Sequence, residues 1–125
     1  MNLDFASVWE MISDIVPDND ALICGDEVVT WKEYDEKSSK IATALSAAGL
    51  QANSKAGLYL NNSNEYLIAQ NAIFKIGGIP INVNYRYVAE ELIYLLDNSD
   101  SEAVFYHACY SDRIKEIASS LPNIK

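Results

Sequence analysis

The chain has 125 residues and a mass of 13.9 kDa, the size of one domain or of part of a larger one. It carries 9 basic and 18 acidic residues, a net charge of −9, which argues against nucleic-acid binding because such modules usually present a basic face. No stretch approaches the roughly 20 apolar residues of a membrane span. The first residues lack the basic head and apolar block of a signal peptide. We therefore expect a soluble, cytoplasmic chain.

The two cysteines and the single histidine leave little room for metal chemistry. Cys24 and Cys109 lie far apart without metal-ligand spacing, so we expect both to be small buried apolar residues. His107 is the only histidine, which excludes paired-histidine zinc sites. It ends a β-prone run, where packing is its more common role. A functional role stays open, because ligands gather at the carboxyl ends of parallel strands.

The first segments of the chain predict a helix followed by a hairpin. Apolar residues recur at helical spacing over 5–15, and Pro17 ends the pattern. Two β-prone runs, 20–24 and 27–30, flank Gly25-Asp26 and predict a hairpin.

A well-marked helix follows the hairpin. Thr30 and Glu33 have the spacing of a capping box, in which the side chain of each residue bonds the backbone N–H of the other. An apolar stripe runs behind them to Gly49, where a left-handed helix stop is expected.

Strands and helices then alternate to the end of the chain. Strands are predicted over 56–60, 79–83 and 103–107, and Pro80 implies that the second is an edge strand or that the proline is among its first residues. The helix over 63–76 is apolar on nearly every side, so we expect it to be sandwiched between other elements.

Three polar or small segments delimit these later helices. Asn62 is the expected N-cap of the helix over 63–76, with Glu65 as its reciprocal partner, and Gly77-Gly78 ends that helix. Another helix follows Val88, and Ser111 is the expected cap of the last one.

The order of these elements predicts an α/β fold with a mostly parallel sheet and covering helices, preceded by a helix and a β-hairpin. Short connections with right-handed crossovers place the strand ends along one rim. Leu60-Asn61, Val83-Asn84 and His107 are then expected to line that rim.

The usual catalytic motifs are missing from the sequence. There is no Gly-rich loop ending in Lys-Ser/Thr, no G-x-G-x-x-G and no nucleophile elbow. The acidic clusters lie at helix starts or on solvent faces, where they complement helix dipoles. We therefore assign no catalytic residue and no metal ligand.

One arginine stands out between two aromatic residues. Arg86 lies between Tyr85 and Tyr87, just after a predicted strand end. A guanidinium there suits a phosphate or carboxylate, because its fork can donate two hydrogen bonds to one anion. A surface ion pair with Glu90 or Glu91 is the alternative, and the residues alone favour it.

Several segments match a known family in the family's order: 20–23 with 29–34, 45–50, 62–65, 72–82, 84–86 and 90–100. Together they resemble the N-terminal part of the acyl-CoA synthetases, members of the adenylate-forming superfamily. Each segment alone is weak evidence, whereas the ordered set, which covers nearly the whole chain, is specific. The resemblance implies that residues 1–125 are an incomplete N-terminal portion of an AMP-binding (adenylation) domain.

The resemblance further implies a two-step ligase. A carboxylic acid, expected to be a long-chain fatty acid, attacks the α-phosphate of ATP, and the thiol of CoA then displaces AMP. The full-length enzyme would need ATP, Mg²⁺ and CoA, and its partner here would be the remainder of its own chain. Arg86 matches an arginine that meets a phosphate of CoA in some relatives, which makes Arg86, Tyr85 and Tyr87 the candidate CoA-binding residues.

The sequence also departs from the family pattern. The family's phosphate loop with its lysine, the adenine and ribose contacts and the C-terminal domain with the catalytic lysine would all lie beyond Lys125. Gly78 stands where alanine is common. We therefore expect the fragment alone to bind none of the cofactors and to be inactive. The alternative is a free-standing flavodoxin-like domain that binds a small ligand or a partner without catalysis.

Overall fold

The computed structural model describes residues 3–125. The expected helix and hairpin come first, and helices and strands then alternate, so the predicted order is confirmed. The elements are α1 (Phe5–Ile15), β1 (Asp20–Cys24), β2 (Glu27–Thr30), α2 (Trp31–Ala47), β3 (Lys55–Tyr59), α3 (Asn64–Lys75), β4 (Ile79–Asn82), α4 (Ala89–Asn98), β5 (Ser101–Tyr106), the 3₁₀ turn η1 (Ala108–Tyr110) and α5 (Ser111–Ala118).

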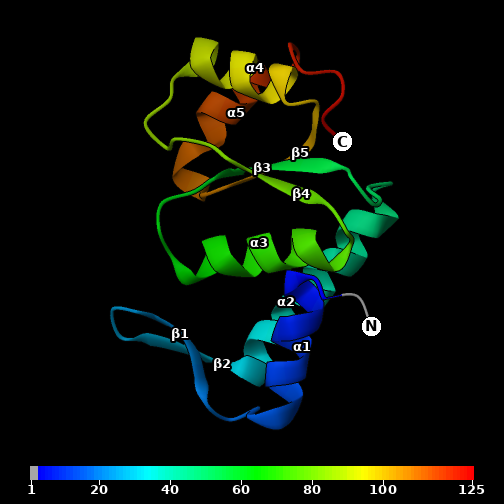
Figure 1. Cartoon of the computed structure of the whole chain (residues 1–125). Helices are drawn as coiled ribbons and strands as arrows, with labels where there is room; N and C mark the ends of the chain where they lie inside the picture. The colour runs from blue at the N-terminus through cyan, green and yellow to red at the C-terminus, as the bar shows by residue number, and fades with distance from the viewer. Residues whose placement is uncertain (1–2) are drawn as a thin grey trace.

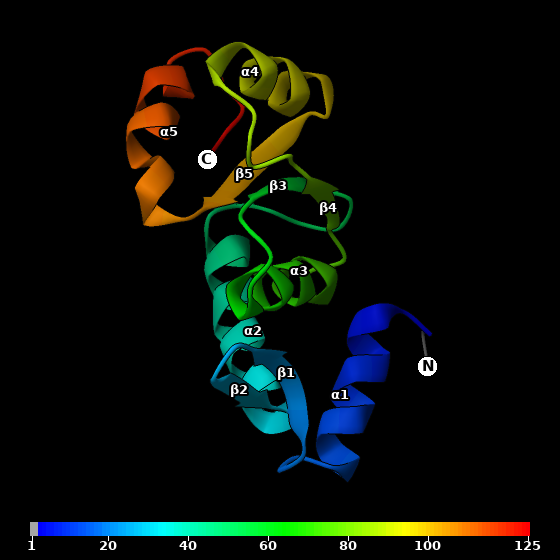
Figure 2. The same cartoon turned by 90° about the vertical axis from the view of Figure 1, so that its left-hand side faces the viewer.

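A three-stranded parallel sheet in the order β4-β3-β5 forms the middle layer of the fold. Helices α4 and α5 cover one face of this sheet, and α3 with α2 covers the other (Figures 1 and 2). Helix α1 and the antiparallel β1–β2 hairpin lie at the end of the molecule that is distant from α4 and α5 (Figure 1). The structure confirms the predicted α/β fold with a parallel sheet preceded by a helix and a hairpin.

Strand β3 is the central strand and is buried on both faces. Its side chains alternate, as the pleat of a strand requires. Ala56 and Leu58 join the cluster with α2 and α3, whereas Tyr59 joins the cluster with α4 and α5. Strand β4 lies at the edge of the sheet, so the prediction from Pro80 is confirmed.

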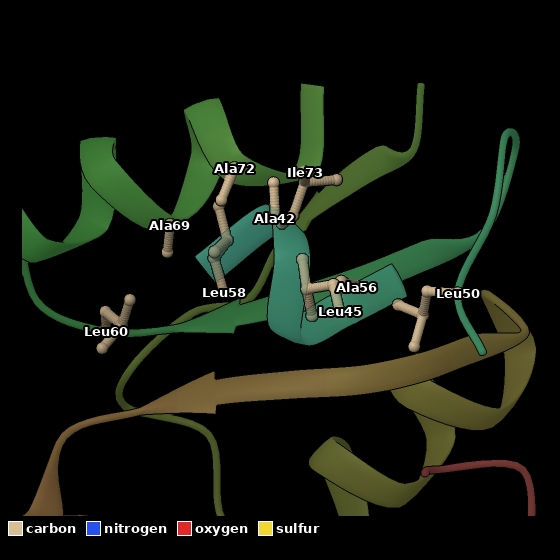
Figure 3. Packing of buried hydrophobic residues seen from close by; sticks show 9 residues of the cluster. All are labelled: Ala42, Leu45, Leu50, Ala56, Leu58, Leu60, Ala69, Ala72 and Ile73. Atoms are coloured by element: carbon tan, nitrogen blue, oxygen red, sulfur yellow. The ribbon is translucent and has the colours of Figure 1, made fainter. Parts of the chain in front are cut away.

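The main core lies between the sheet and helices α2 and α3. Figure 3 shows its side chains converging from the two helices and from the segment of β3. Helix α3 is buried both toward this core and toward the hairpin, where Ile68 packs with Leu22 and Val29. The expectation that this helix is sandwiched is confirmed. Among residues 3–125, no helix combines the length and apolar character that crossing a membrane requires.

Local sequence signals delimit α2 as predicted. The Thr30 backbone N–H donates to the Glu33 carboxylate (3.0 Å), and the Glu33 N–H donates to Thr30 Oγ1 (3.2 Å). The two bonds satisfy N–H groups that a helix start would otherwise leave unpaired. Gly49 follows the helix with φ +94°, a left-handed conformation that glycine adopts without steric cost.

Two predicted caps are wrong. Ser63, not Asn62, caps α3: its backbone is extended, and its Oγ accepts from the Tyr66 N–H (3.3 Å). Ser111 is the first residue of α5 rather than its cap, because the 3₁₀ turn precedes it and its Oγ donates to the Ala108 carbonyl. Each predicted cap is therefore displaced by one residue.

The prediction that both cysteines are buried is also wrong. Cys24 and Cys109 are free thiols exposed to solvent. Cys24 ends β1 at the tip of the hairpin, and Cys109 lies in η1. Both positions are at turns, which run over the surface.

Gly78 is packed tightly between the end of α3 and the backbone of Ser54, the residue before β3. A Cβ at this position would lie 2.9 Å from the Ser54 carbonyl oxygen and 3.1 Å from that of Ile73. Both are backbone atoms, so an alanine here would require a backbone shift. The close packing of this turn therefore favours glycine at position 78.

Lys75 joins the three helices on one side of the sheet. Its Nζ donates to Glu10 of α1 (2.7 Å) and to Asp35 of α2 (2.6 Å), and its side chain is only 8% exposed. Burial alone would lower the pKa of Lys75, but the hydrogen bonds and charges of Asp35 and Glu10 outweigh burial and raise this pKa. The lysine is thus charged and paired where α1, α2 and α3 meet.

The capping box of α2 gives a test of the fold. We expect Thr30→Ala to lower the free energy of unfolding by about 1 kcal/mol, because it leaves the Glu33 N–H unpaired. Thr43→Ala is the matched control on the same helix: Thr43 is exposed and bonds only the Ser39 carbonyl, so we expect no loss of stability and a small gain, since alanine is the better helix former. Urea unfolding of the two variants measures the difference. Equal effects would contradict the importance of the cap.

Candidate functional site

The carboxyl ends of the three parallel strands meet at one edge of the sheet. Leu58 is level with Asn82 of β4 and with Phe105 of β5, so the segments that follow the strands are neighbours. Leu60-Asn61, Val83-Asn84 and His107 therefore lie along one rim, as predicted. We call the segments 60–62, 83–88 and 107–110 the rim.

Tyr59 joins the core to the rim. Its ring is fully buried, and its hydroxyl donates to the Tyr87 carbonyl (3.0 Å). Arg113 of α5 donates through Nη1 to both the Tyr59 hydroxyl and the Tyr87 carbonyl, each at 3.0 Å. A buried hydroxyl without a hydrogen-bond partner would be costly. The Tyr87 carbonyl and the Arg113 guanidinium are therefore held next to the carboxyl end of β3.

Tyr110 links the remaining two segments of the rim. Its ring stacks on Tyr59 with centroids 4.6 Å apart, and its hydroxyl donates to Asn61 Oδ1 (2.7 Å). The loops after β3, β4 and β5 are therefore connected through one cluster of aromatic rings and polar groups.

The segment with the candidate CoA-binding residues belongs to this rim. Arg86 is exposed, and its guanidinium carbon lies 5.4 Å from the centroid of the Tyr85 ring, within the range of a cation–π contact. The Arg86 backbone N–H donates to Asn84 Oδ1 (2.9 Å). Tyr85 is exposed, whereas Tyr87 is half-buried.

The ion pair considered for Arg86 does not form in the described part of the chain. Neither Glu90 nor Glu91 lies within salt-bridge distance of Arg86. Glu91 instead accepts from the Val88 backbone N–H (2.8 Å) at the start of α4. The guanidinium of Arg86 thus faces solvent without a carboxylate partner among residues 3–125.

Two hollows open at the rim. One of about 450 Å³ lies beside the arginine segment and is lined by Tyr85, Tyr87 and Asn62 among others. The other, of about 540 Å³, lies between α2, α3 and the end of β5, and its lining includes Lys37, Lys40 and Glu65. His107 also lines this second hollow and is partly exposed.

Within residues 3–125, no group of three or more His, Cys, Asp or Glu side chains is placed to hold a metal ion. The rim offers the Arg86 guanidinium and the exposed Tyr85 ring, whereas the side-chain oxygens of Asn61 and Asn84 accept internal hydrogen bonds. This arrangement suits the binding of an anionic or planar group better than acid–base chemistry.

Sequence reasoning missed three residues that form or support the rim. Tyr59 lies inside a predicted strand, Tyr110 lies just before the predicted last helix and Arg113 lies within it, and none of them was predicted to belong to a site. The available signal was the position of Tyr59 next to a strand end, because a tyrosine there can be buried only if its hydroxyl finds a partner.

Comparisons with known proteins identify the family to which the chain belongs. The sequence model of the AMP-binding enzymes matches residues 13–125. The chain therefore belongs to the AMP-binding enzyme family.

Individual relatives agree with this assignment. The chain is 44% identical over 123 residues to a medium/long-chain-fatty-acid–CoA/3-oxocholest-4-en-26-oate–CoA ligase of Mycobacterium marinum, covering 98% of this chain and 22% of that ligase. The chain thus spans less than a quarter of that relative's length.

Solved structures show the same fold. A putative long-chain-fatty-acid CoA ligase from Rhodopseudomonas palustris superimposes with a TM-score of 0.91 at 23% identity, over 98% of this chain and 31% of that one. The N-terminal domain of FACL13 from Mycobacterium tuberculosis gives a TM-score of 0.86 at 22% identity, over 95% of this chain and 31% of that one.

The exposure of the cysteines gives a test of the rim and of the hairpin. We expect both thiols of the native chain to react with a thiol reagent such as dithiobisnitrobenzoate without denaturant, because both side chains are exposed. Cys24→Ser should leave one reactive thiol, that of Cys109 in the rim. A thiol that reacts only after unfolding would contradict its placement at the surface.

Proposed function

We propose that this chain is the N-terminal portion of the AMP-binding domain of a ligase that joins a medium- or long-chain fatty acid to CoA. The observation that carries the proposal is the 44% identity to a medium/long-chain fatty acid ligase across 98% of this chain. The family match over residues 13–125 favours this function over a free-standing flavodoxin-like binding domain.

The proposed reaction has two steps. The fatty acid carboxylate attacks the α-phosphate of ATP, which releases pyrophosphate and leaves an acyl-adenylate. The CoA thiol then attacks the acyl carbon, and AMP leaves. We propose that the phosphate loop, the adenine and ribose contacts and the catalytic lysine belong to the part of the ligase outside these 125 residues. The chain's 22% share of the Mycobacterium marinum ligase supports this division.

Residues 3–125 form no magnesium site of their own. Mg²⁺ would neutralise charge on the transferring phosphates when bound. The described residues offer no cluster of side chains that could hold it, so we assign no metal ligand to this chain.

The arginine segment fits a phosphate of CoA. The Arg86 guanidinium is exposed and rests over the Tyr85 ring, and no carboxylate of residues 3–125 occupies its fork. We propose that Arg86 binds a phosphate of CoA by charge-assisted hydrogen bonds, with Tyr85 and Tyr87 as neighbouring contacts.

Arg86→Ala tests this role in the complete ligase. We expect the KM for CoA to rise by about tenfold, the loss of one charge-assisted contact, while ATP–pyrophosphate exchange changes much less. Lys32→Ala, which removes a cation exposed at the start of α2, is the control and should change neither value. An equal loss in both half-reactions would instead indicate a structural role for Arg86.

The isolated chain tests the division of the site. We expect purified residues 1–125 to show no fatty-acid-dependent ATP–pyrophosphate exchange, because the sequence has no phosphate loop. The complete ligase at the same concentration is the positive control. Exchange by the isolated chain above the rate without fatty acid would contradict the proposal that adenylation needs the rest of the ligase.

A further inference from the structure

Arg113 makes an unusual pair of contacts for a residue on a surface helix. A single nitrogen, Nη1, donates to the Tyr59 hydroxyl and to the Tyr87 carbonyl, both at 3.0 Å. The Tyr59 hydroxyl donates to the same carbonyl. The Tyr87 carbonyl thus accepts two hydrogen bonds, of which the one from Arg113 is charge-assisted. Tyr87 directly follows Arg86 in the sequence.

The backbone is held on both sides of Arg86. On the side before it, Asn84 Oδ1 accepts the Arg86 N–H (2.9 Å), and the Asn84 carbonyl accepts the Tyr87 N–H (3.0 Å). On the side after it, the Tyr87 carbonyl is held by Tyr59 and Arg113. The segment has no regular secondary structure of its own, so these contacts supply the constraints that a helix or strand would otherwise provide.

We propose that Arg113 and Tyr59 are positioning residues that hold the segment 84–88, and with it the guanidinium of Arg86, in place for a phosphate of CoA. The inference rests on the proposed function of Arg86, but it concerns two residues that lie 54 positions apart and are brought together only by the fold. Tyr59 supplies a rigid base, because its ring is fully buried and stacked on Tyr110.

The charge of Arg113 strengthens this arrangement. An arginine guanidinium is charged at any working pH, and the hydrogen bond with Tyr59 raises the pKa of Arg113 further. Its two bonds are therefore charge-assisted. A charge-assisted bond is about twice as strong as a neutral one, which suits a contact that must restrain an exposed loop.

The test compares the complete ligase with four single-substitution variants of it. Arg113→Met removes both donated bonds while keeping most of the side-chain volume. Arg113→Lys keeps the positive charge, but its Nζ ends one bond short of Nη1, so this variant tests whether the charge alone is enough. Tyr59→Phe removes only the hydroxyl. Lys115→Met is the control, since Lys115 lies on the same helix and is 79% exposed.

Two readouts separate positioning from general stability. The first is hydrogen–deuterium exchange of the amides of residues 84–88 without ligand. The second is the dissociation constant for CoA from calorimetry. We expect Arg113→Met to raise both the exchange rate of the segment and the dissociation constant by about tenfold. Tyr59→Phe should shift both in the same direction. Arg113→Lys should give values between those of the native ligase and Arg113→Met, and Lys115→Met should change nothing.

A double variant distinguishes failure of this inference from failure of the proposed function. If Arg113 acts through Arg86, Arg113→Met should weaken CoA binding little further once Arg86 is alanine. If Arg86→Ala itself leaves CoA binding unchanged, the proposed function of Arg86 fails. If Arg86→Ala weakens binding but Arg113→Met changes neither the exchange of 84–88 nor CoA affinity, the positioning role is wrong. Faster exchange throughout the chain in Arg113→Met would also overturn it, because that pattern indicates a global loss of stability.

Discussion

The buried hydroxyl of Tyr59 is the interaction on which the arrangement of the rim depends. The tyrosine ring belongs to the core between the sheet and α4 with α5, whereas its hydroxyl lies where the core ends. A polar group that is withdrawn from water needs hydrogen-bond partners, and here the partners come from the loop after β4 and from α5. The packing of the core therefore determines the geometry of the exposed segments.

This coupling is possible because β3 is the central strand. Its side chains pack against helices on both faces of the sheet, and small side chains make this possible. At Gly57, a Cβ would lie 2.7 Å from Leu96 Cδ2, so a side chain here would displace the end of the Leu96 side chain of α4. Helix α5 packs in the same cluster as Tyr59 through Ile117, and its Arg113 reaches the Tyr59 hydroxyl. The helices thus do more than cover the sheet, since one of them contributes a donor to the rim.

The parts of the fold that are determined by residues close together in the sequence could be predicted. The hairpin bounds and the capping box of α2 follow from turn residues and from a three-residue spacing, which are local signals. The position of a cap is harder to predict. Asn62 and Ser63 are both good N-cap residues, and the extended backbone of Ser63 decides between them. No sequence pattern near Cys24 or Cys109 told a buried position from an exposed turn.

The candidate site could be predicted only in part, for the same reason. Arg86 is recognisable because its aromatic neighbours and the strand before it are adjacent in sequence. The contact between Arg113 and Tyr59 joins residues 54 positions apart, so a rule based on short sequence spacing cannot predict it. A resemblance to a family identifies only those site residues that match one of its motifs. A residue that acts on a motif from another element becomes visible only in the folded chain.

The net charge of −9 places a further constraint on any site for an anion. An acidic chain repels phosphates at long range, so affinity must come from local cations whose charge is not already neutralised. Lys75 is paired with Glu10 and Asp35, and Lys125 is paired with Glu102. Arg86 has no such partner among the described residues, and Arg113 bonds only neutral oxygens of Tyr59 and Tyr87. Arg86 in the rim and Arg113 beside it are therefore cations without a hydrogen-bonded carboxylate. An anion at this edge of the sheet would be attracted by these two cations rather than by the charge of the chain as a whole.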